Sequence, residues 1–403
     1  MSRPRWIVVG IAALALLLAL APFVPRGEDH PDGAIRPSGE DEGGTAEGRV
    51  LPANAAGPSR VTREMQAEID RVVAAGRRIG APGTKAGLAA VEAVRCAELD
   101  GQRYCLGVGW TRDTEDAVRD RVEEAAREAD RARATTTSTG DLDAAAALDR
   151  LASMSPGERA AAERAELTEA AQAVAKVWLL RHEFQGVPLP RGFLARHPEA
   201  RATAAAGVAR RSTGDYPRKS KILNWRHARE QNRTYWCGPT TMQAIGWGWE
   251  DRVRPQRFWA RHLNTTRDGT SITDMVRAVN RYTGYDRPRR AGQYITLDVG
   301  DWSFGQWRLL MMRHIHDYRA PVVLHPVLRD EYYPYLAGDA SGHFQVGRGY
   351  DKHGRRPLLL GYFEPWNQQR FDPSEPYIAR VQWRQAYKSY RANQAHPFHN
   401  VGV

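Results

Sequence analysis

Tryptophan is concentrated in the second half of this chain of 403 residues. Nine of its twelve tryptophans lie from Trp225 onward, whereas the stretch before it is dominated by alanine, arginine and glutamate. Because large aromatic side chains supply much of the buried area of a core, we expect the densely packed domain to span residues 216–403. The chain is long enough for two or three domains, so the segments before residue 216 are interpreted separately.

The first 26 residues have the pattern of an export segment. A basic start, Met1 to Arg5, precedes 19 residues without a charge, Trp6 to Val24. That run is just long enough to cross a bilayer, and the combination is typical of a signal peptide or a membrane anchor. Both interpretations stay open for residues 1–26. Either way the segment engages the membrane or the export machinery, and we expect a protein that is secreted or anchored to the outer face of a bacterial cytoplasmic membrane.

Three further segments precede the aromatic-rich domain. Residues 27–60 are rich in glycine, proline and acidic residues and poor in large apolar ones, which predicts a disordered linker. Residues 61–182 are predicted to be a helical accessory region, and the proline-containing residues 183–215 a connector. The accessory region is either a propeptide that covers a functional site or a spacer or wall-binding module, and we favour the second interpretation.

The three cysteines divide into a predicted pair and a single thiol. Cys96 and Cys105 flank Asp100-Gly101, a strong signal for a hairpin turn. Folding the chain back at this turn would bring the two cysteines close enough for a disulfide, which an exported protein would form. Cys237 is then left unpaired, as either an inert buried thiol or a reactive one.

The aromatic-rich domain changes from helical to strand patterns along its length. The predicted segments are helices over 239–249, 271–282 and 302–318, then strands within 321–328, 342–350 and 357–366. Helices followed by a sheet indicate an α+β architecture.

Cys237 lies where the first of these helices begins. Pro239 favours a helix start, and a cysteine at a helix N-terminus has its thiolate stabilised by the helix dipole and free N–H groups. Gln231 lies six residues earlier and carries an amide that can donate to a developing oxyanion, together with the backbone N–H of Cys237. The pattern favours a cysteine nucleophile with its oxyanion hole.

Candidates for the remaining catalytic groups follow in the strand region. His343 begins an apparent strand and is the candidate base, whereas His325 lies inside an apolar run and is interpreted as a packed residue. Glu364 ends the next strand and could orient the imidazole of His343; Asn367 is the alternative for that role. No zinc-binding pattern is found, so we predict neither a metal nor another cofactor.

The net charge of +11 bears on the partners of the protein. A basic surface favours contact with anionic polymers, such as those of a cell wall. The sequence has no nucleic-acid-binding motif, so no nucleic acid is predicted as a partner. Abundant alanine, arginine and glycine are also typical of a GC-rich bacterial genome, which raises the arginine content without a functional demand.

Three segments together resemble a known family. They are Gln231 to Pro239, Gly342 to Asp351, and Glu364-Pro365. This pattern is similar to that of the bacteriocin-processing (double-glycine leader) peptidases and their stand-alone relatives in the papain-like clan. The resemblance covers about residues 225–370. It implies a papain-like α+β fold in which Gln231 serves the oxyanion hole, Cys237 is the nucleophile and His343 the base.

The resemblance also has a departure. Family members usually carry Asp-Pro where this chain has Glu364-Pro365, so the third residue is left between Glu364 and Asn367. The predicted function is an exported cysteine peptidase or related amide hydrolase acting on a peptide or protein. The alternative is a non-catalytic papain-like module that binds peptide or cell wall, and transfer to an acceptor amine would use the same residues. The leader-peptide substrate of the founding members is not implied.

Overall fold

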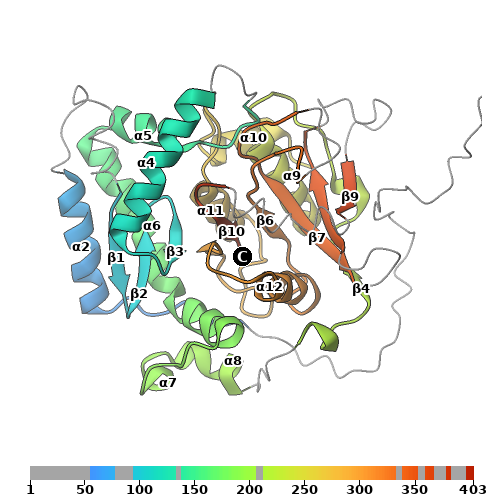
Figure 1. Cartoon of the computed structure of the whole chain (residues 1–403). Helices are drawn as coiled ribbons and strands as arrows, with labels where there is room; N and C mark the ends of the chain where they lie inside the picture. Colours follow the sequence, from blue (N-terminus) through green and yellow to red (C-terminus); the bar gives the residue numbers. More distant parts are fainter. Residues whose placement is uncertain are drawn as a thin grey trace, which may run out of the picture.

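The computed structural model describes residues 55–77, 94–132, 138–205, 212–332, 338–352, 359–366, 378–382 and 396–403 (Figure 1). The export segment 1–26, most of the linker 27–60 and the candidate Asn367 lie outside the described residues. Within the described residues, no helix combines the length and the apolar character needed to span a membrane.

The strands of the described chain belong to one sheet. They are β1 (Cys96–Leu99), β2 (Gln102–Cys105), β3 (Gly109–Thr111), β4 (Lys219–Lys221), β5 (Thr296–Asp298), β6 (Val322–Leu324), β7 (Gln345–Asp351), β8 (Leu359–Glu364), β9 (Ile378–Gln382) and β10 (Asn400–Gly402). Their order is β1-β2-β3-β5-β10-β6-β7-β8-β9, and β4 also pairs with β7. The pairings are antiparallel, except that β3 runs parallel to β5. Mixed helices and a mainly antiparallel sheet confirm the α+β prediction.

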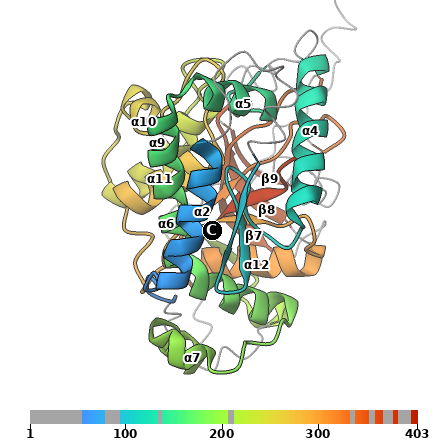
Figure 2. The same ribbon diagram turned by 90° about the vertical axis from the view of Figure 1, so that its left-hand side faces the viewer.

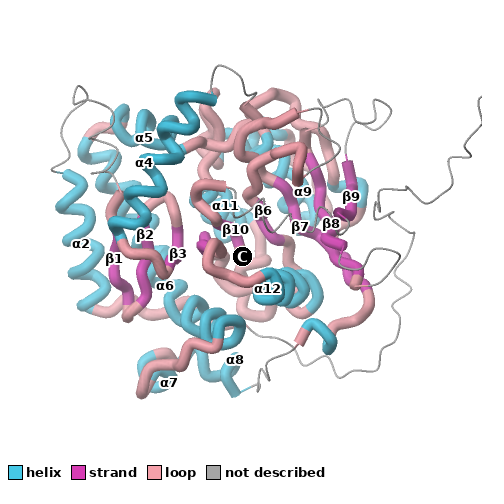
Figure 3. Tube along the Cα trace, in the orientation of Figure 1, coloured by secondary structure: helices cyan, strands magenta, loops and turns pink. Residues whose placement is uncertain are grey.

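The α-helices of the described chain lie around this sheet (Figure 3). They are α2 (Arg63–Arg77), α4 (Glu115–Ala132), α5 (Ala144–Ser153), α6 (Pro156–Leu180), α7 (Phe193–Arg196), α8 (Arg201–Ala205), α9 (Cys237–Glu250), α10 (Gln256–His262), α11 (Ile272–Tyr282) and α12 (Phe304–His316). Apolar spacing predicted α9, α11 and α12 within two residues of their observed ends. It missed the short α10.

Serine caps explain where several helices begin. The Ser155 side chain accepts from the backbone N–H of Glu158, whose carboxylate accepts in return from the Ser155 N–H, at the start of α6. Ser303 and Gln306 form the same reciprocal pair at the start of α12. Each capping box satisfies two backbone N–H groups that would otherwise lack a partner.

Cys96 and Cys105 are directly opposite each other on β1 and β2 and are joined by a disulfide. The turn between the strands has positive φ at both Asp100 (47°) and Gly101 (76°). This backbone suits the twist of a two-residue hairpin, which explains why Asp-Gly is a strong turn signal. The disulfide lies in the sheet face against α4, where Val118 and Val122 pack in the same apolar cluster.

The region predicted as a helical accessory region shares the sheet with the aromatic-rich domain. Residues 61–182 supply β1–β3 as well as helices, and β3 pairs with β5 through Trp110 and Leu297. Figure 2 shows α2, the β1–β2 hairpin and α4 on the face that this region presents. The largest apolar cluster accordingly joins residues from both parts of the chain, including Ile69, Trp178 and Trp302.

Helices cover both faces of the sheet, and β6 shows the alternation. Val322 and Leu324 pack in the cluster that includes residues of α6 and α12, whereas Val323 between them packs in the cluster of α9 and α11. Successive side chains of a strand point to opposite faces, so α9 lies on one face and α12 on the other. This arrangement brings the first turn of α9 against the start of β7.

Candidate active site

Cys237 is the first residue of α9 and is fully buried. Pro239 is the third residue of the helix and not the first; the N–H that proline lacks would still have no partner in the helix at this position. In the next turn, the Thr241 hydroxyl donates to the Phe344 carbonyl at 3.0 Å. This buried bond fixes the start of α9 beside the residues that lead into β7.

His343 lies two residues before β7 and is fully buried. Its backbone N–H donates to the Pro326 carbonyl at 2.8 Å. Its ring Nε2 is 2.5 Å from Oε1 of Glu364, the last residue of β8. The Nδ1 atom of the same ring is buried and has no hydrogen-bond partner among the described residues. One nitrogen is therefore anchored on a carboxylate, and the other remains available.

Glu364 is almost completely buried, and described residues donate hydrogen bonds to both of its carboxylate oxygens. Besides His343, the side chain of Gln345 donates to Oε2 at 2.6 Å, and the backbone N–H of Trp366 donates to Oε1 at 2.9 Å. A buried carboxylate needs such partners because its desolvation is otherwise expensive. The Trp366 ring also lies 6.3 Å from the His343 ring, centroid to centroid. Glu364, one of the two residues that the sequence offered for the orienting role, therefore contacts the His343 ring, whereas Asn367, the other, lies outside the described residues.

The loop before α9 places Gln231 close to the same residues. Its backbone N–H donates to the Pro365 carbonyl at 2.9 Å, directly after Glu364. Its side-chain Nε2 is within 2.9 Å of the Arg233 carbonyl and 2.6 Å of the Thr234 carbonyl. These contacts fix the amide inside the loop that leads into Cys237.

The two predicted oxyanion donors converge on one acceptor. The carbonyl oxygen of Thr139 accepts from the backbone N–H of Cys237 at 3.3 Å and from Nε2 of Gln231 at 3.2 Å. Thr139 belongs to the loop between α4 and α5, about a hundred residues before either donor. The donors predicted from sequence therefore do meet, and a carbonyl of the same chain lies between them.

The electrostatics of the site keep the thiol neutral. Burial raises the pKa of Cys237 well above its ordinary value, and the negative charge of Asp141 raises it further, while backbone hydrogen bonding from Phe344 and Gly238 lowers it. No hydrogen bond joins Cys237 to the described His343 ring, although Phe344 is next to His343 in the chain. The structure therefore brings Cys237, His343, Glu364 and Gln231 to one place around an unreactive thiol.

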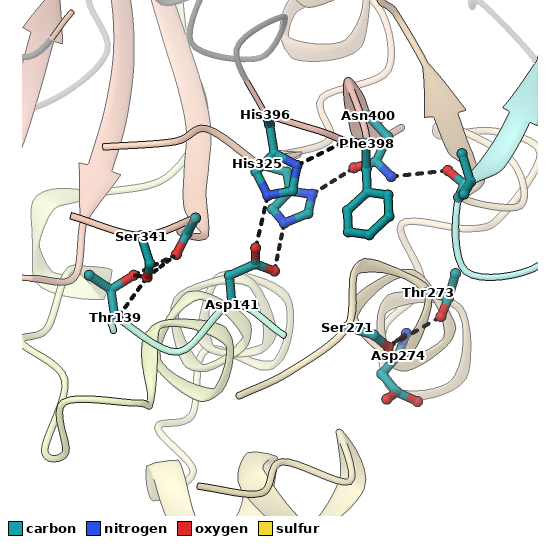
Figure 4. Close-up of polar contacts among 12 residues, drawn as sticks. Thr139, Asp141, Ser271, Thr273, Asp274, His325, Ser341, His396, Phe398 and Asn400 are labelled. Carbon is teal, nitrogen blue, oxygen red and sulfur yellow. Dashed lines mark hydrogen bonds and ion pairs between the residues drawn. The ribbon is translucent and has the colours of Figure 1, made fainter. Parts of the chain in front are cut away.

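A second cluster of buried polar residues was missed by the sequence analysis. In Figure 4, His325 and His396 both direct Nε2 at the carboxylate of Asp141. The distances are 2.7 Å from His325 to Oδ1 and 2.8 Å from His396 to Oδ2, and all three side chains are buried. His325 was expected to be a packed residue; it is buried, but it is also paired with a carboxylate. No sequence signal linked the three positions.

The hydrogen bonds of the rings indicate their protonation. Asn400 donates through Nδ2 to the Val108 carbonyl at 3.0 Å, which turns its Oδ1 toward Nδ1 of His325 at 2.6 Å. Both nitrogens of His325 thus face oxygen atoms of other side chains. The backbone N–H of Phe398 donates to Nδ1 of His396 at 3.2 Å, so Nε2 of His396 carries the proton.

These three side chains are also close enough together to hold a metal ion. The hydrogen bonds fit a metal poorly, because a ligating imidazole binds through an unprotonated nitrogen and donates from the other. His396 has the reverse arrangement, since its Nδ1 accepts a hydrogen bond. The donor set therefore fits direct pairing between Asp141 and the two histidines better than metal ligation.

An open pocket of about 750 Å³ lies beside the N-terminal end of α9. Tyr235 and Trp236, which directly precede Cys237, form part of its wall. Four arginines from three segments also line it: Arg233, Arg257, Arg261 and Arg267. No acidic residue is among the lining residues, so the pocket carries a concentration of positive charge next to the nucleophile candidate.

Comparison with known proteins identifies the part of the chain that holds most of these residues. Residues 221–395 match the Peptidase_C39 like family. The resemblance inferred from the Gln231, His343 and Glu364 segments is thereby confirmed, and these residues form a papain-like, C39-like domain. The chain matches no curated protein and no solved structure. Thr139 and Asp141 lie outside the matched range, although they contact the C39-like domain at its centre.

Proposed function

We propose that the chain is an exported cysteine peptidase, or a closely related amide hydrolase, with Cys237, His343 and Glu364 as its reacting and orienting groups. The observation that carries the proposal is the His343 ring. Its Nε2 is anchored on Glu364 at 2.5 Å, and its buried Nδ1 has no partner. Thiol hydrolysis requires a base that is oriented by a carboxylate and keeps one nitrogen free, and the residue after His343 contacts both Cys237 and the first turns of α9. The match to a C39-like peptidase family supports the same reading.

The reaction follows from this arrangement. Nδ1 of His343 takes the thiol proton, and Sγ of Cys237 attacks the carbonyl carbon of the substrate amide. The N–H of Cys237 and the Nε2 of Gln231 donate to the oxyanion. Protonated His343 passes its proton to the leaving nitrogen as the C–N bond breaks. Water then attacks the thioester, His343 takes the proton of this water, and the acid product leaves with the thiol restored.

The disulfide supports the exported location within this proposal. Cys96 and Cys105 are bonded in the β1–β2 hairpin, and disulfides persist in oxidising compartments. In such a compartment an exposed thiol would be oxidised. Burial of Cys237, the free cysteine, is consistent with that demand. The expected location stays outside the cytoplasm, either secreted or anchored to the membrane.

The arginine-lined pocket supports an acidic substrate. No ion pair joins any of its four arginines to another residue of the described chain, and the pocket opens beside Trp236, which directly precedes Cys237. We expect peptides with aspartate or glutamate near the scissile bond to be cleaved with higher kcat/KM than their amide counterparts. The measurement is a matched series of quenched peptides, assayed with the protein and with Arg257→Ala/Arg261→Ala. An equal ranking in both proteins would remove this part of the proposal.

The main test is hydrolysis that depends on Cys237. The full chain is incubated with a library of internally quenched peptides, and new products are identified by mass spectrometry. We expect Cys237→Ala to remove every product. The matched control is Cys96→Ala/Cys105→Ala, which removes the other two sulfur atoms, far from the base, and should retain product formation while folded. Identical products from the protein and from Cys237→Ala would contradict the proposal.

A further inference from the structure

Residues 138–142 cross the candidate active site from one wall to the other. On one side, the Thr139 N–H donates to the Ser341 hydroxyl at 2.9 Å, and the Thr139 hydroxyl donates to the Gly342 carbonyl at 2.6 Å. On the other side, the backbone N–H of Thr270 donates to the Gly140 carbonyl at 2.9 Å. Figure 4 shows Thr139 beside Ser341 at the strand side of the site. The segment is bonded to both walls.

The segment binds as an extended peptide would. The Leu142 N–H donates to the Thr270 carbonyl at 2.9 Å, which together with the Gly140 bond makes a parallel bridge between Asp141 and Thr270. An added strand recognised through backbone hydrogen bonds is a common mode of peptide binding. Thr139, Gly140, Asp141 and Leu142 are all buried, so little of this stretch remains in contact with solvent.

The Thr139 carbonyl occupies the position that the reaction assigns to the oxyanion. It accepts from Cys237 N–H and from Gln231 Nε2, the two donors expected to stabilise a scissile carbonyl. Both donors are thus already engaged before any substrate arrives. A peptide substrate could use them only after this carbonyl has left.

Close backbone contact fixes the position after Thr139. Gly140 has φ of 111°, and a Cβ atom there would lie 2.3 Å from the carbonyl carbon of Tyr235. Only glycine adopts this conformation without strain, and the clash is with backbone, which cannot move aside as a flexible side chain would. The segment therefore lies against the loop that leads into Cys237 because residue 140 has no side chain.

Asp141 fastens the segment to the strand side. Its carboxylate lies between His325 and His396, at 2.7 and 2.8 Å. A Cβ atom on Gly342 would lie 2.1 Å from Oδ2 of Asp141, so the carboxylate is seated directly over the residue before His343. Removing one partner of a buried ion pair leaves an uncompensated charge and is strongly unfavourable. The cluster thus favours the seated position of the segment.

The same carboxylate suppresses the reactivity of the thiol. After burial, the charge of Asp141 is the next largest cause that raises the pKa of Cys237. Departure of the segment would remove this charge from the site and admit water, and both changes favour the thiolate. The seated segment therefore explains both the occupied site and the unreactive thiol.

We propose that residues 138–142 are an internal inhibitor that occupies the peptide-binding groove of the C39-like domain, with Thr139 at the carbonyl position and Asp141 clamped by His325 and His396. The word inhibitor rests on the proposed function, because only an enzyme can be inhibited. Occupancy of the groove by the segment can be tested without measuring turnover. The unmodified protein then cleaves substrates slowly, because only the fraction of molecules with a displaced segment is active, and its groove accepts an extended peptide with a glycine directly after the scissile carbonyl.

The test measures access to Cys237 by alkylation with iodoacetamide. The other two cysteines are bonded to each other, so the site of labelling in the native full chain is unambiguous by mass spectrometry. We expect slow labelling of the unmodified protein and labelling at least roughly tenfold faster for Gly140→Ala, since overpacking a tight site shifts the equilibrium by such factors. The matched control is Gly157→Ala, where a Cβ atom meets nothing within 4 Å and labelling should stay slow.

A second variant keeps the proposal open to refutation if Gly140→Ala does not fold. Asp141→Asn preserves the shape of the side chain but removes its charge, and it should also accelerate labelling; Asp120→Asn, an exposed position on α4, is its control. Circular dichroism and thermal unfolding establish that each variant is folded. Fast labelling of the unmodified protein, or equal slow rates in it and in both folded groove variants, would overturn the proposal.

Turnover of the quenched peptides separates this inference from the proposed function. If the groove variants are labelled quickly and also cleave peptides faster than the unmodified protein, both stand. If they are labelled quickly but cleave nothing, the groove is occupied as proposed and the hydrolase assignment fails. If all proteins cleave at one rate through Cys237, the hydrolase assignment stands and internal inhibition is wrong.

Discussion

Two buried histidine–carboxylate arrangements involve histidines of the C39-like domain: His343 pairs with Glu364 inside it, and His325 pairs with Asp141 from outside the matched range. They differ in one respect. His343 binds Glu364 through Nε2, and its Nδ1 has no partner. His325 binds Asp141 through Nε2 and Asn400 through Nδ1, so both nitrogens are engaged. Burial and a short contact to a carboxylate are common to both. The unused nitrogen is what distinguishes a ring that can move a proton from one that holds a segment in place.

The two carboxylates also differ in the part of the chain to which they belong. Glu364 is part of the sheet, at the end of β8, and is held there by Gln345 and the Trp366 N–H. Asp141 belongs to a loop from another part of the chain, and the two histidines are its main attachments. Loss of the first pair should therefore affect chemistry, and loss of the second should affect the position of the loop.

The strongest test of this difference is to make the same substitution at His343 and at His325. In a Gly140→Ala background, His343→Gln keeps a donor for Glu364 but has no nitrogen base, and we expect peptide cleavage to fall by about 10³-fold or more. His325→Gln should leave cleavage within about threefold, but it removes a buried partner of the Asp141 carboxylate and should cost about 3–5 kcal/mol of stability. Initial rates and urea unfolding measure the two effects. Equal losses of activity would mean that the two rings are not functionally distinct.

The orienting carboxylate should give the next largest effect. Glu364→Gln places an amide opposite the side-chain amide of Gln345 and removes the charge that stabilises protonated His343. We expect kcat to fall by about 10²-fold, with KM little changed, because the carboxylate does not touch the substrate. Glu331→Gln, an exposed glutamate outside the site, serves as the control. An unchanged kcat would remove Glu364 from the reaction and return attention to Asn367.

Acid should reduce the stability of the folded chain through protonation of His396, which pairs with Asp141. Burial lowers the pKa of His396 to about 4 from its ordinary 6.5. Since the pKa of His396 is lower in the folded chain than in the unfolded chain, the unfolded chain takes up the proton first as the pH falls. The contribution of His396 to stability is therefore fully present above about pH 6.5 and is lost as the pH drops toward 4. We expect His396 alone to account for a loss of roughly 2–3 kcal/mol over this window. Burial also lowers the pKa of His227, to about 4, and that of His314, to about 3.

A variant isolates the His396 contribution. Urea unfolding between pH 7 and pH 4 gives the dependence of stability on pH, whose slope counts the protons that the unfolded chain binds in excess. His396→Gln should lower this count by about one proton and leave the contributions of the other two histidines. The same slope in both proteins would show that His396 is already protonated in the folded state.

The comparison also shows how far the sequence could lead. Cys237, His343 and Glu364 could be named as candidates because each lies beside a local signal: a helix start, a Gly-His before a strand, and a strand end followed by proline. The positions of α9, α11 and α12 followed from apolar spacing in the same way. Local patterns of this kind carry over to the structure because short-range contacts determine them.

The second arrangement could not have been found from local patterns. Asp141 and His325 are 184 positions apart, and His396 is another 71 positions along the chain. They meet only because β10 is inserted between β5 and β6 in the middle of the sheet, and because the loop after α4 crosses to the C39-like domain. Register and insertion order of strands depend on long-range packing, which no window of residues contains.

The smallest expected effect is that of zinc on the Asp141 cluster. The three side chains lie close enough together for a metal ion, but Nδ1 of His396 accepts the N–H of Phe398 and both nitrogens of His325 face acceptors. Binding of zinc would require His325 to give up its contact with Asp141 or with Asn400, and His396 to turn. We therefore expect stoichiometric zinc chloride, and equally EDTA, to shift the Tm by less than about 1 °C, within the change that small stability differences produce. His325→Gln is the control, because it removes one of the three donors. A rise of several degrees with zinc that His325→Gln abolishes would make the cluster a metal centre, and the seat of Asp141 would then depend on a metal ion as well as on the two histidines.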